Sequence, residues 1–172
     1  MDVPLRVVAG AESQTGGMAF EDLVEAANVR LFRALYLMTG NRFEAEEVMQ
    51  DAFLAVWERW DRVGEMDDPT GYLFRTALNI WRKRLRRASL AARKALSLAP
   101  DDDAFATVDE READFVALRS LKPKERAAIV VTGLLGYTAE SAAPLLGMSS
   151  ATVRMYASRA RAALKDLMED PR

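Results

Sequence analysis

The sequence lacks cysteine and histidine altogether, in a chain of 172 residues. These absences exclude disulfides, thiol nucleophiles, imidazole acid–base catalysis and the usual zinc ligand sets. An enzyme would have to use carboxylate, Ser, Lys or Tyr groups. No apolar run approaches the roughly 20 residues that span a bilayer, and the first residues lack a signal-peptide pattern. We therefore expect a cytoplasmic protein without membrane insertion.

Acidic residues are missing from one long segment, between Arg75 and Lys94, although the whole chain has a formal net charge of -2. The basic residues of this segment are Arg75, Arg82, Lys83, Arg84, Arg86, Arg87, Arg93 and Lys94. Such segregation indicates a surface that binds a polyanion, and DNA is the polyanion that we favour. For this segment taken alone, a run of solvated charges is an equal alternative.

Apolar spacing predicts an all-α protein made of two small helical bundles. Helices are expected over 20–39, from 43 to just before 63, from 69 through the basic segment, and over about 110–121, 123–135, 138–146 and 149–168. The buried stripe of the third helix is expected to contain Tyr72, Leu73, Thr76, Ala77, Ile80 and Leu85, with Trp81 also in the core. Gly40 and Gly136 are expected to end helices, and Asp68 to precede one as an N-cap.

Composition divides the chain into four segments. Residues 1–18 form a flexible leader, 19–95 the first domain, 96–109 an acidic linker and 110–170 the second domain. The linker contains Asp101, Asp102 and Asp103. Two roles stay open for these acids: they mask the basic helix in the free protein, or they form a solvated spacer.

The last two predicted helices have the layout of a helix-turn-helix. Thr138 can cap the first helix, Gly147 permits a tight turn, and Ser149 or Ser150 can cap the second helix. In this motif the first turns of the second helix enter the major groove, where Arg reads guanine edges. The alternative is an ordinary helical hairpin with exposed arginines, which the separate basic helix makes less favoured.

Three motifs in this order resemble the extracytoplasmic function (ECF) family of bacterial sigma factors. They are AEEVMQDAF at 45–53, YLFRTALN at 72–79 running into Arg86 and Arg87, and LGMS at 146–149 followed by TVR at 152–154 and RAR at 159–161. The resemblance covers 20–87 and 121–167. It implies a protein that binds core RNA polymerase, directs it to minus-35/minus-10 promoters and helps to open the DNA.

The resemblance also implies roles for individual residues. Those that would dock on the β′ clamp helices of the polymerase are Glu46, Glu47, Gln50, Asp51, Leu54 and Trp57. Those that would bind the minus-10 element are Tyr72, Asn79, Arg82, Lys83, Arg86 and Arg87. Those that would bind the minus-35 element are Arg126, Ser150, Thr152, Arg154, Ser158 and Arg159. A contact of the second domain with the β flap and an anti-sigma partner are expected in the same way.

The chain departs from the family pattern at a few positions. Ala151, Met155 and Tyr156 differ from the usual residues of the second motif helix, so promoter preference is expected to differ. Pro144 stands inside the first motif helix, where it removes a hydrogen bond. Lys83 stands where an Asp is common, which makes the minus-10 helix more basic.

Two other classes of protein are alternatives to this interpretation. A dimeric helix-turn-helix regulator would need only the second domain and would leave the first motif unexplained. An enzyme would need metal-binding carboxylates, and Glu47 with Asp51 is at most an isolated pair or a solvated helical face. The sequence therefore predicts no catalytic residue, no metal and no cofactor.

Overall fold

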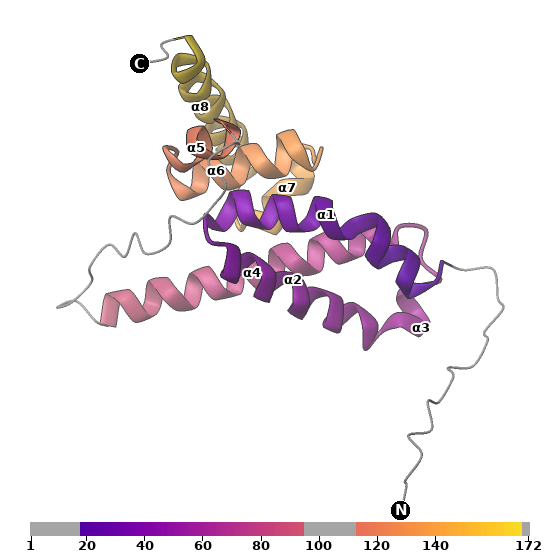
Figure 1. The fold of residues 1–172 in the computed structure, drawn as a ribbon. Coiled ribbons are helices and arrows are strands. Elements are labelled where there is room, and N and C mark those ends of the chain that lie inside the picture. Colours follow the sequence, from indigo (N-terminus) through magenta and orange to yellow (C-terminus); the bar gives the residue numbers. More distant parts are fainter. Residues whose placement is uncertain (1–17, 95–112, 170–172) are drawn as a thin grey trace, which may run out of the picture.

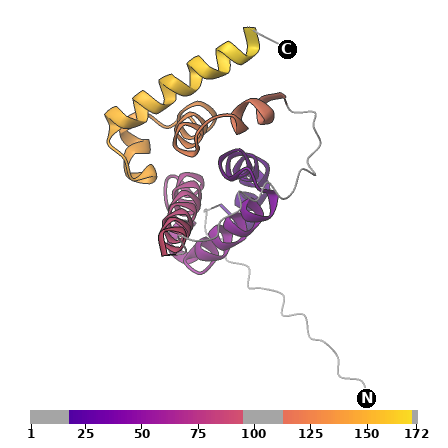
Figure 2. The ribbon, with the colours of Figure 1, turned by 90° about the vertical axis from the view of Figure 1, so that its left-hand side faces the viewer.

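The structure is a computed structural model that describes residues 18–94 and 113–169, and every regular element in these ranges is a helix. The elements are α1 (Phe20–Thr39), α2 (Arg42–Trp57), α3 (Trp60–Val63), α4 (Pro69–Lys94), α5 (Ala113–Arg119), α6 (Pro123–Ile129), η1 (Val130–Leu134), α7 (Ala139–Leu146) and α8 (Ser150–Glu169). Helices α1–α4 form one half and α5–α8 the other, and the two halves pack against each other (Figures 1 and 2). The predicted all-α fold is confirmed.

Local signals set the helix boundaries in the first half. Gly40 ends α1 with a φ of 70°, and the Asn41 side chain caps α2 by accepting the Glu44 N–H at 3.0 Å. Asp68 accepts the Gly71 N–H at 2.7 Å through Oδ1 and so caps α4, as predicted. These caps satisfy backbone groups that a helix end leaves open.

The expected single helix from 43 to 63 is interrupted in the structure. α2 ends at Trp57, and Arg59, with φ -122° and ψ 18°, separates it from the short α3. The break places the Trp60 ring 5.2 Å from the Phe20 ring of α1, while the Arg59 side chain caps the Ala55 carbonyl. Packing on α1 thus overrides the helical propensity of the segment.

The core explains one correct and one wrong prediction on α4. Trp81 is buried at 6 % exposure, together with Leu73 and Ala77, as expected, and Leu78 is buried although it was not predicted to be. Leu85 is 43 % exposed, so its predicted place in the buried stripe is wrong. Leu85 follows Trp81 by about one turn, so it has the right period but is not covered, and the carboxyl end of α4 extends beyond the other helices, as Figure 1 shows.

In the second half, a five-residue π-helix follows α6 where one continuous helix was predicted. Thr138 caps α7 by accepting the Ser141 N–H at 3.1 Å, and Ser149 caps α8 by accepting the Thr152 N–H at 3.1 Å. Gly147 turns the chain between them with a φ of 66°, and α7 runs through Pro144. The helix–turn–helix layout is therefore present.

Several predicted features lie partly or wholly outside the described residues. These are the leader, the acidic linker with Asp101, Asp102 and Asp103, and the first residues of the helix expected from 110. None of the described helices is long and apolar enough to cross a membrane.

Candidate nucleic-acid interface

The basic outer side of α4 forms the first part of the candidate site. Arg75, Lys83, Arg86 and Arg87 are exposed, and no acidic residue lies on the helix. Tyr72 and Asn79 are half-buried and lie seven residues apart, so they share one side of α4. Cations and a partly accessible aromatic and amide pair are suited to phosphate and base contacts.

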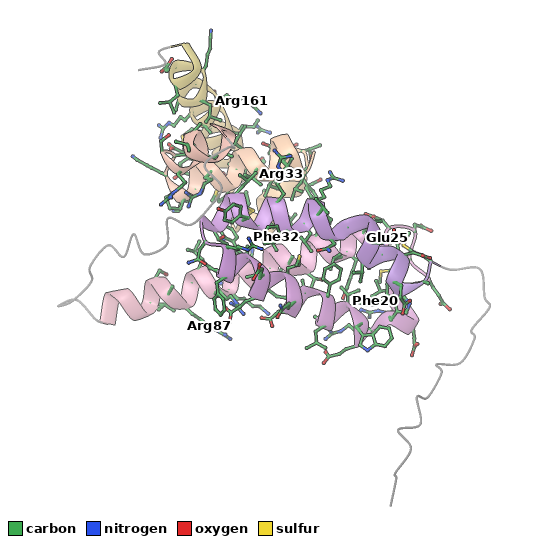
Figure 3. The ribbon with its side chains drawn as sticks, viewed as in Figure 1. Phe20, Glu25, Phe32, Arg33, Arg87 and Arg161 are labelled. Carbon is green, nitrogen blue, oxygen red and sulfur yellow. The ribbon has the colours of Figure 1, made fainter. Side chains whose placement is uncertain are left out.

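The helix-turn-helix forms the second part, in the other half of the molecule. Val153, Ala157 and Ala160 face the core, which leaves Arg154, Ser158 and Arg159 exposed on the outer side of α8. Ser150 and Thr152 lie at its first turn, where the Thr152 hydroxyl is 2.7 Å from the Ser149 hydroxyl. Figure 3 shows Arg87 and Arg161 on separate halves, one on α4 and one on α8.

Arg154 has a protein partner within the motif. Its Nη1 donates to the Oε1 of Glu140, which lies in the first turn of α7. A hydrogen bond from the Glu140 backbone N–H and one from the Arg154 guanidinium hold the pKa of Glu140 below its usual value. Arg154, one of the residues predicted to bind the minus-35 element, is thus ion-paired within the protein.

The outer face of α2 carries the predicted polymerase-docking set. Gln50 and Asp51 are exposed, and Glu46 is ion-paired with Arg42 at 2.9 Å. Glu47 and Asp51 each lie 2.7 Å from Arg84 of α4. These two hydrogen bonds raise the pKa of Arg84, and they mean that both carboxylates already share one basic partner within the protein, which leaves the cluster with one net negative charge.

An exposed apolar edge continues this face toward the end of α2. Leu54 is 57 % and Trp57 53 % exposed, and the Trp57 ring packs edge-on against Phe20 at 4.9 Å. Exposed large apolar side chains beside acids are typical of a protein-binding surface. The described residues contain no group of acids suited to hold a metal ion.

In the part of the chain that the structure describes, Arg82, Arg126 and Arg30 connect the two halves through the same kind of contact. Arg82 donates to the Pro144 carbonyl at 2.5 Å, Arg126 to Met38 at 3.1 Å, and Arg30 to Leu135 at 3.1 Å. The acceptors lie at or just beyond the carboxyl ends of α7, α1 and η1, where carbonyls lack partners within the helix. Each arginine therefore caps a helix of the other half, which also suits the helix dipole.

This contact between the halves contains a polar atom without a partner and borders a pocket. Arg82 Nε is buried without a hydrogen-bond partner, and burial lowers the pKa of Arg126. A cavity of about 250 Å³ lies along the contact, lined in part by Arg30, Asp68 and Tyr137. Buried polar atoms without partners oppose association, so the contact is suited to opening.

Comparisons with known proteins match both halves. The family profile described as Sigma-70 region 2 matches residues 23–90, and that described as Sigma-70, region 4 matches residues 116–164. The ECF RNA polymerase sigma factor SigM of Mycobacterium tuberculosis is 30 % identical over 156 residues, which cover 87 % of this chain and 77 % of that protein. The chain belongs to the ECF sigma factor family.

Other relatives agree with this assignment. The RNA polymerase sigma-E factor of Streptomyces avermitilis is 27 % identical, with 88 % of this chain and 86 % of that protein covered. The sigma factor RpoE of Bartonella quintana, solved in complex with the anti-sigma factor NepR, shares the fold with a TM-score of 0.65 at 22 % identity, over 89 % of this chain and 98 % of that one. SigJ of M. tuberculosis gives a TM-score of 0.56 at 29 % identity, covering 86 % of this chain and 52 % of that one.

Sequence reasoning missed three residues of this sigma factor that the structure makes prominent. The sequence places Arg84 in the basic segment without a partner, and it predicts no role for Glu140 or Arg30. Their contacts span 37, 14 and 105 positions, respectively. No local signal identifies such partners. The packing of α2 on α4, of α7 on α8 and of α1 on η1 brings these partners together.

Proposed function

We propose that this ECF sigma factor binds core RNA polymerase, directs it to minus-35/minus-10 promoters and promotes DNA opening. The observation that carries this proposal is the presence of one DNA-suited helix in each family domain, the acid-free α4 and the capped α8. The domains assigned to these roles are 19–95 and 110–170, joined by the linker at 96–109. As an initiation factor it is not an enzyme, and it acts in the cytoplasm.

For the minus-10 element, α4 supplies two kinds of contact. Lys83, Arg86 and Arg87 neutralise phosphates, and Arg82 joins them once it leaves Pro144. Tyr72 and Asn79 hold an unstacked base by stacking and amide hydrogen bonds. Capture of such bases stabilises the open strands without nucleotide hydrolysis.

For the minus-35 element, the first turns of α8 enter the major groove. Arg154 and Ser158 read base edges, while Thr152, Arg159 and Ser150 contact bases or phosphates. Arg126 adds a phosphate contact when it is released from Met38. The need for both domains disfavours a dimeric regulator that uses the helix-turn-helix alone.

The α2 face meets the polymerase. Its acidic and amide groups suit basic clamp helices of the β′ subunit, and Leu54 with Trp57 provides the apolar centre of that contact. The second domain contacts the β flap. An anti-sigma factor is a further partner, by analogy with the complex of the Bartonella protein.

Promoter binding also requires the two halves to separate. Elements centred near positions -10 and -35 lie about 25 base pairs apart, or about 85 Å at 3.4 Å per pair. A Cβ on Gly147, in the turn before α8, would lie 3.3 Å from the Arg82 side chain of α4. The closed arrangement is therefore that of the free protein, and the promoter-bound form is open.

Run-off transcription tests the proposal. The template is the fragment upstream of the protein's own gene, because autoregulation is a sensible first guess, and the reaction contains core RNA polymerase with wild type, Asn79→Ala or Arg154→Ala. We expect a specific transcript only with the protein, reduced at least fivefold in each variant, whereas the control Asn28→Ala, an exposed residue of α1, stays at the wild-type level. A protein that shifts DNA as a dimer but neither binds polymerase nor starts transcription would contradict the proposal.

A further inference from the structure

The two helices of the helix-turn-helix are joined by an ion pair at their surface. Arg154 of α8 donates to Glu140 of α7, and the two side chains are 58 % and 66 % exposed. Water and salt screen such a pair, so it adds little to stability. Buried Ala142, Val153 and Ala157 already hold α7 against α8. The pair is therefore not needed to keep the motif folded.

A carboxylate in this position also opposes DNA binding. Because it touches Arg154, Glu140 lies at the surface proposed to meet the minus-35 element, where phosphates repel it. As an exposed carboxylate, Glu140 is charged at neutral pH. A carboxylate here lowers the affinity for every duplex. It can still raise sequence specificity if it lowers the affinity for wrong sequences more than that for the right one.

We propose that Glu140 is a positioning residue for Arg154 and thereby sets the base preference of this sigma factor within the minus-35 element. The inference rests on the proposed function and extends it to a residue outside the groove-reading helix. A guanidinium has five N–H donors in a fixed plane. Glu140 binds at Nη1, which leaves Nε and Nη2 for the O6 and N7 acceptors of a guanine.

Removal of the Glu140 carboxylate would allow the guanidinium plane of Arg154 to rotate. Arg154 would then reach neighbouring phosphates as readily as a base edge, which strengthens binding to any sequence and weakens discrimination. A well-placed bidentate contact separates right from wrong bases by about 5- to 150-fold. We expect Glu140→Ala and Glu140→Gln each to lower the ratio of affinities for the right and the wrong base at least fivefold.

The test uses full-length protein bound to core RNA polymerase and a pool of duplexes randomised across the upstream promoter window. Sequencing of the bound fraction gives the preference at every position for wild type, Glu140→Ala, Glu140→Gln and Arg154→Ala. We expect the Glu140 variants to lose preference at the same positions as Arg154→Ala, with total binding unchanged or higher. For a fixed duplex, the slope of log affinity against log salt should become steeper by about one in Glu140→Ala.

Asp166→Asn is the matched control, since it makes the same charge change as Glu140→Gln at an exposed site about 18 Å further along α8. It should leave every preference unchanged. Wild-type preferences in the Glu140 variants, or losses at positions that Arg154→Ala retains, would overturn the inference. A minus-35 preference that survives in Arg154→Ala overturns it too but leaves the proposed function standing. If the wild-type complex selects no sequence at all, both fail.

Discussion

Two glycines in the second half have positive φ, but their surroundings differ. Gly136 has a φ of 77° and open space where a Cβ would lie, whereas Gly147 has a φ of 66° and the Arg82 side chain 3.3 Å from that position. An L-residue in this backbone conformation costs about 1–2 kcal/mol in either place. Only at Gly147 would a methyl group also press on the contact between the two halves.

We expect Gly136→Ala to lower the free energy of unfolding by about 1 kcal/mol through the backbone alone. Gly147→Ala should lower it by at least as much and, in addition, loosen the closed arrangement. Urea unfolding measures the first effect, and the distance between labelled halves measures the second. Equal behaviour of the two variants in both measurements would show that the Gly147–Arg82 approach has no consequence.

At the scale of elements, α2 and α4 are tied by one side chain that faces two acids. Arg84 is bound by Glu47 and Asp51, while Arg87, one turn further along the same helix, is exposed. The basic run thus contains arginines with two different tasks. Arg84 fixes α2 to α4, and Arg87 faces outward.

Arg84→Met and Arg87→Met separate these tasks. We expect Arg84→Met to lower the free energy of unfolding by about 1 kcal/mol, since it breaks two partly exposed pairs. Arg87→Met should leave stability unchanged and reduce the salt dependence of promoter binding by about one unit of slope. Thermal unfolding measures the stability of each variant, and salt titration of promoter binding by the polymerase complex measures the slope. Loss of stability in Arg87→Met, or an unchanged stability in Arg84→Met, would contradict the prediction.

The apolar edge of α2 allows a similarly matched comparison. Leu54 on α2 and Leu90 on α4 are 57 % and 56 % exposed, so neither substitution removes core packing. We expect Leu54→Ser to weaken binding to core polymerase about tenfold or more, equal to about 1.4 kcal/mol, because it lies at the centre of the proposed contact. Leu90→Ser should have no effect on that affinity. A direct binding titration with core polymerase decides between them.

At the scale of the whole molecule, the contact between the halves uses two arginines that we also propose to bind DNA. Arg82 and Arg126, both expected at DNA, cap Pro144 and Met38 in the closed arrangement. One guanidinium cannot bind a backbone carbonyl of the other half and a distant phosphate at the same time. In the proposed function, closure and promoter binding therefore compete for these two arginines.

The lack of native cysteine makes this competition measurable. Fluorophores on Asp61→Cys in α3 and Asp166→Cys in α8, both exposed sites, report the separation of the halves. We expect high energy transfer in the free protein and a marked decrease when core polymerase binds. Arg30 is not among the proposed DNA contacts, but it donates to the Leu135 carbonyl of the other half. Arg30→Gln should therefore shift the free protein toward the open form. Unchanged transfer on polymerase binding would contradict opening.

Sequence alone determined the helical class, the main caps and the family motifs, because these depend on residues close together along the chain. Apolar spacing located α1 and α8, and Asp68, Thr138 and Ser149 act as caps within three residues of their partners. Only the tertiary structure decided that the helix after Phe43 breaks at Arg59 and that Leu85 is exposed. It also decided which arginines already bind groups within the protein. The local sequence around an arginine is the same whether its partner is a carbonyl 62 positions away, as for Arg82, or a phosphate of DNA.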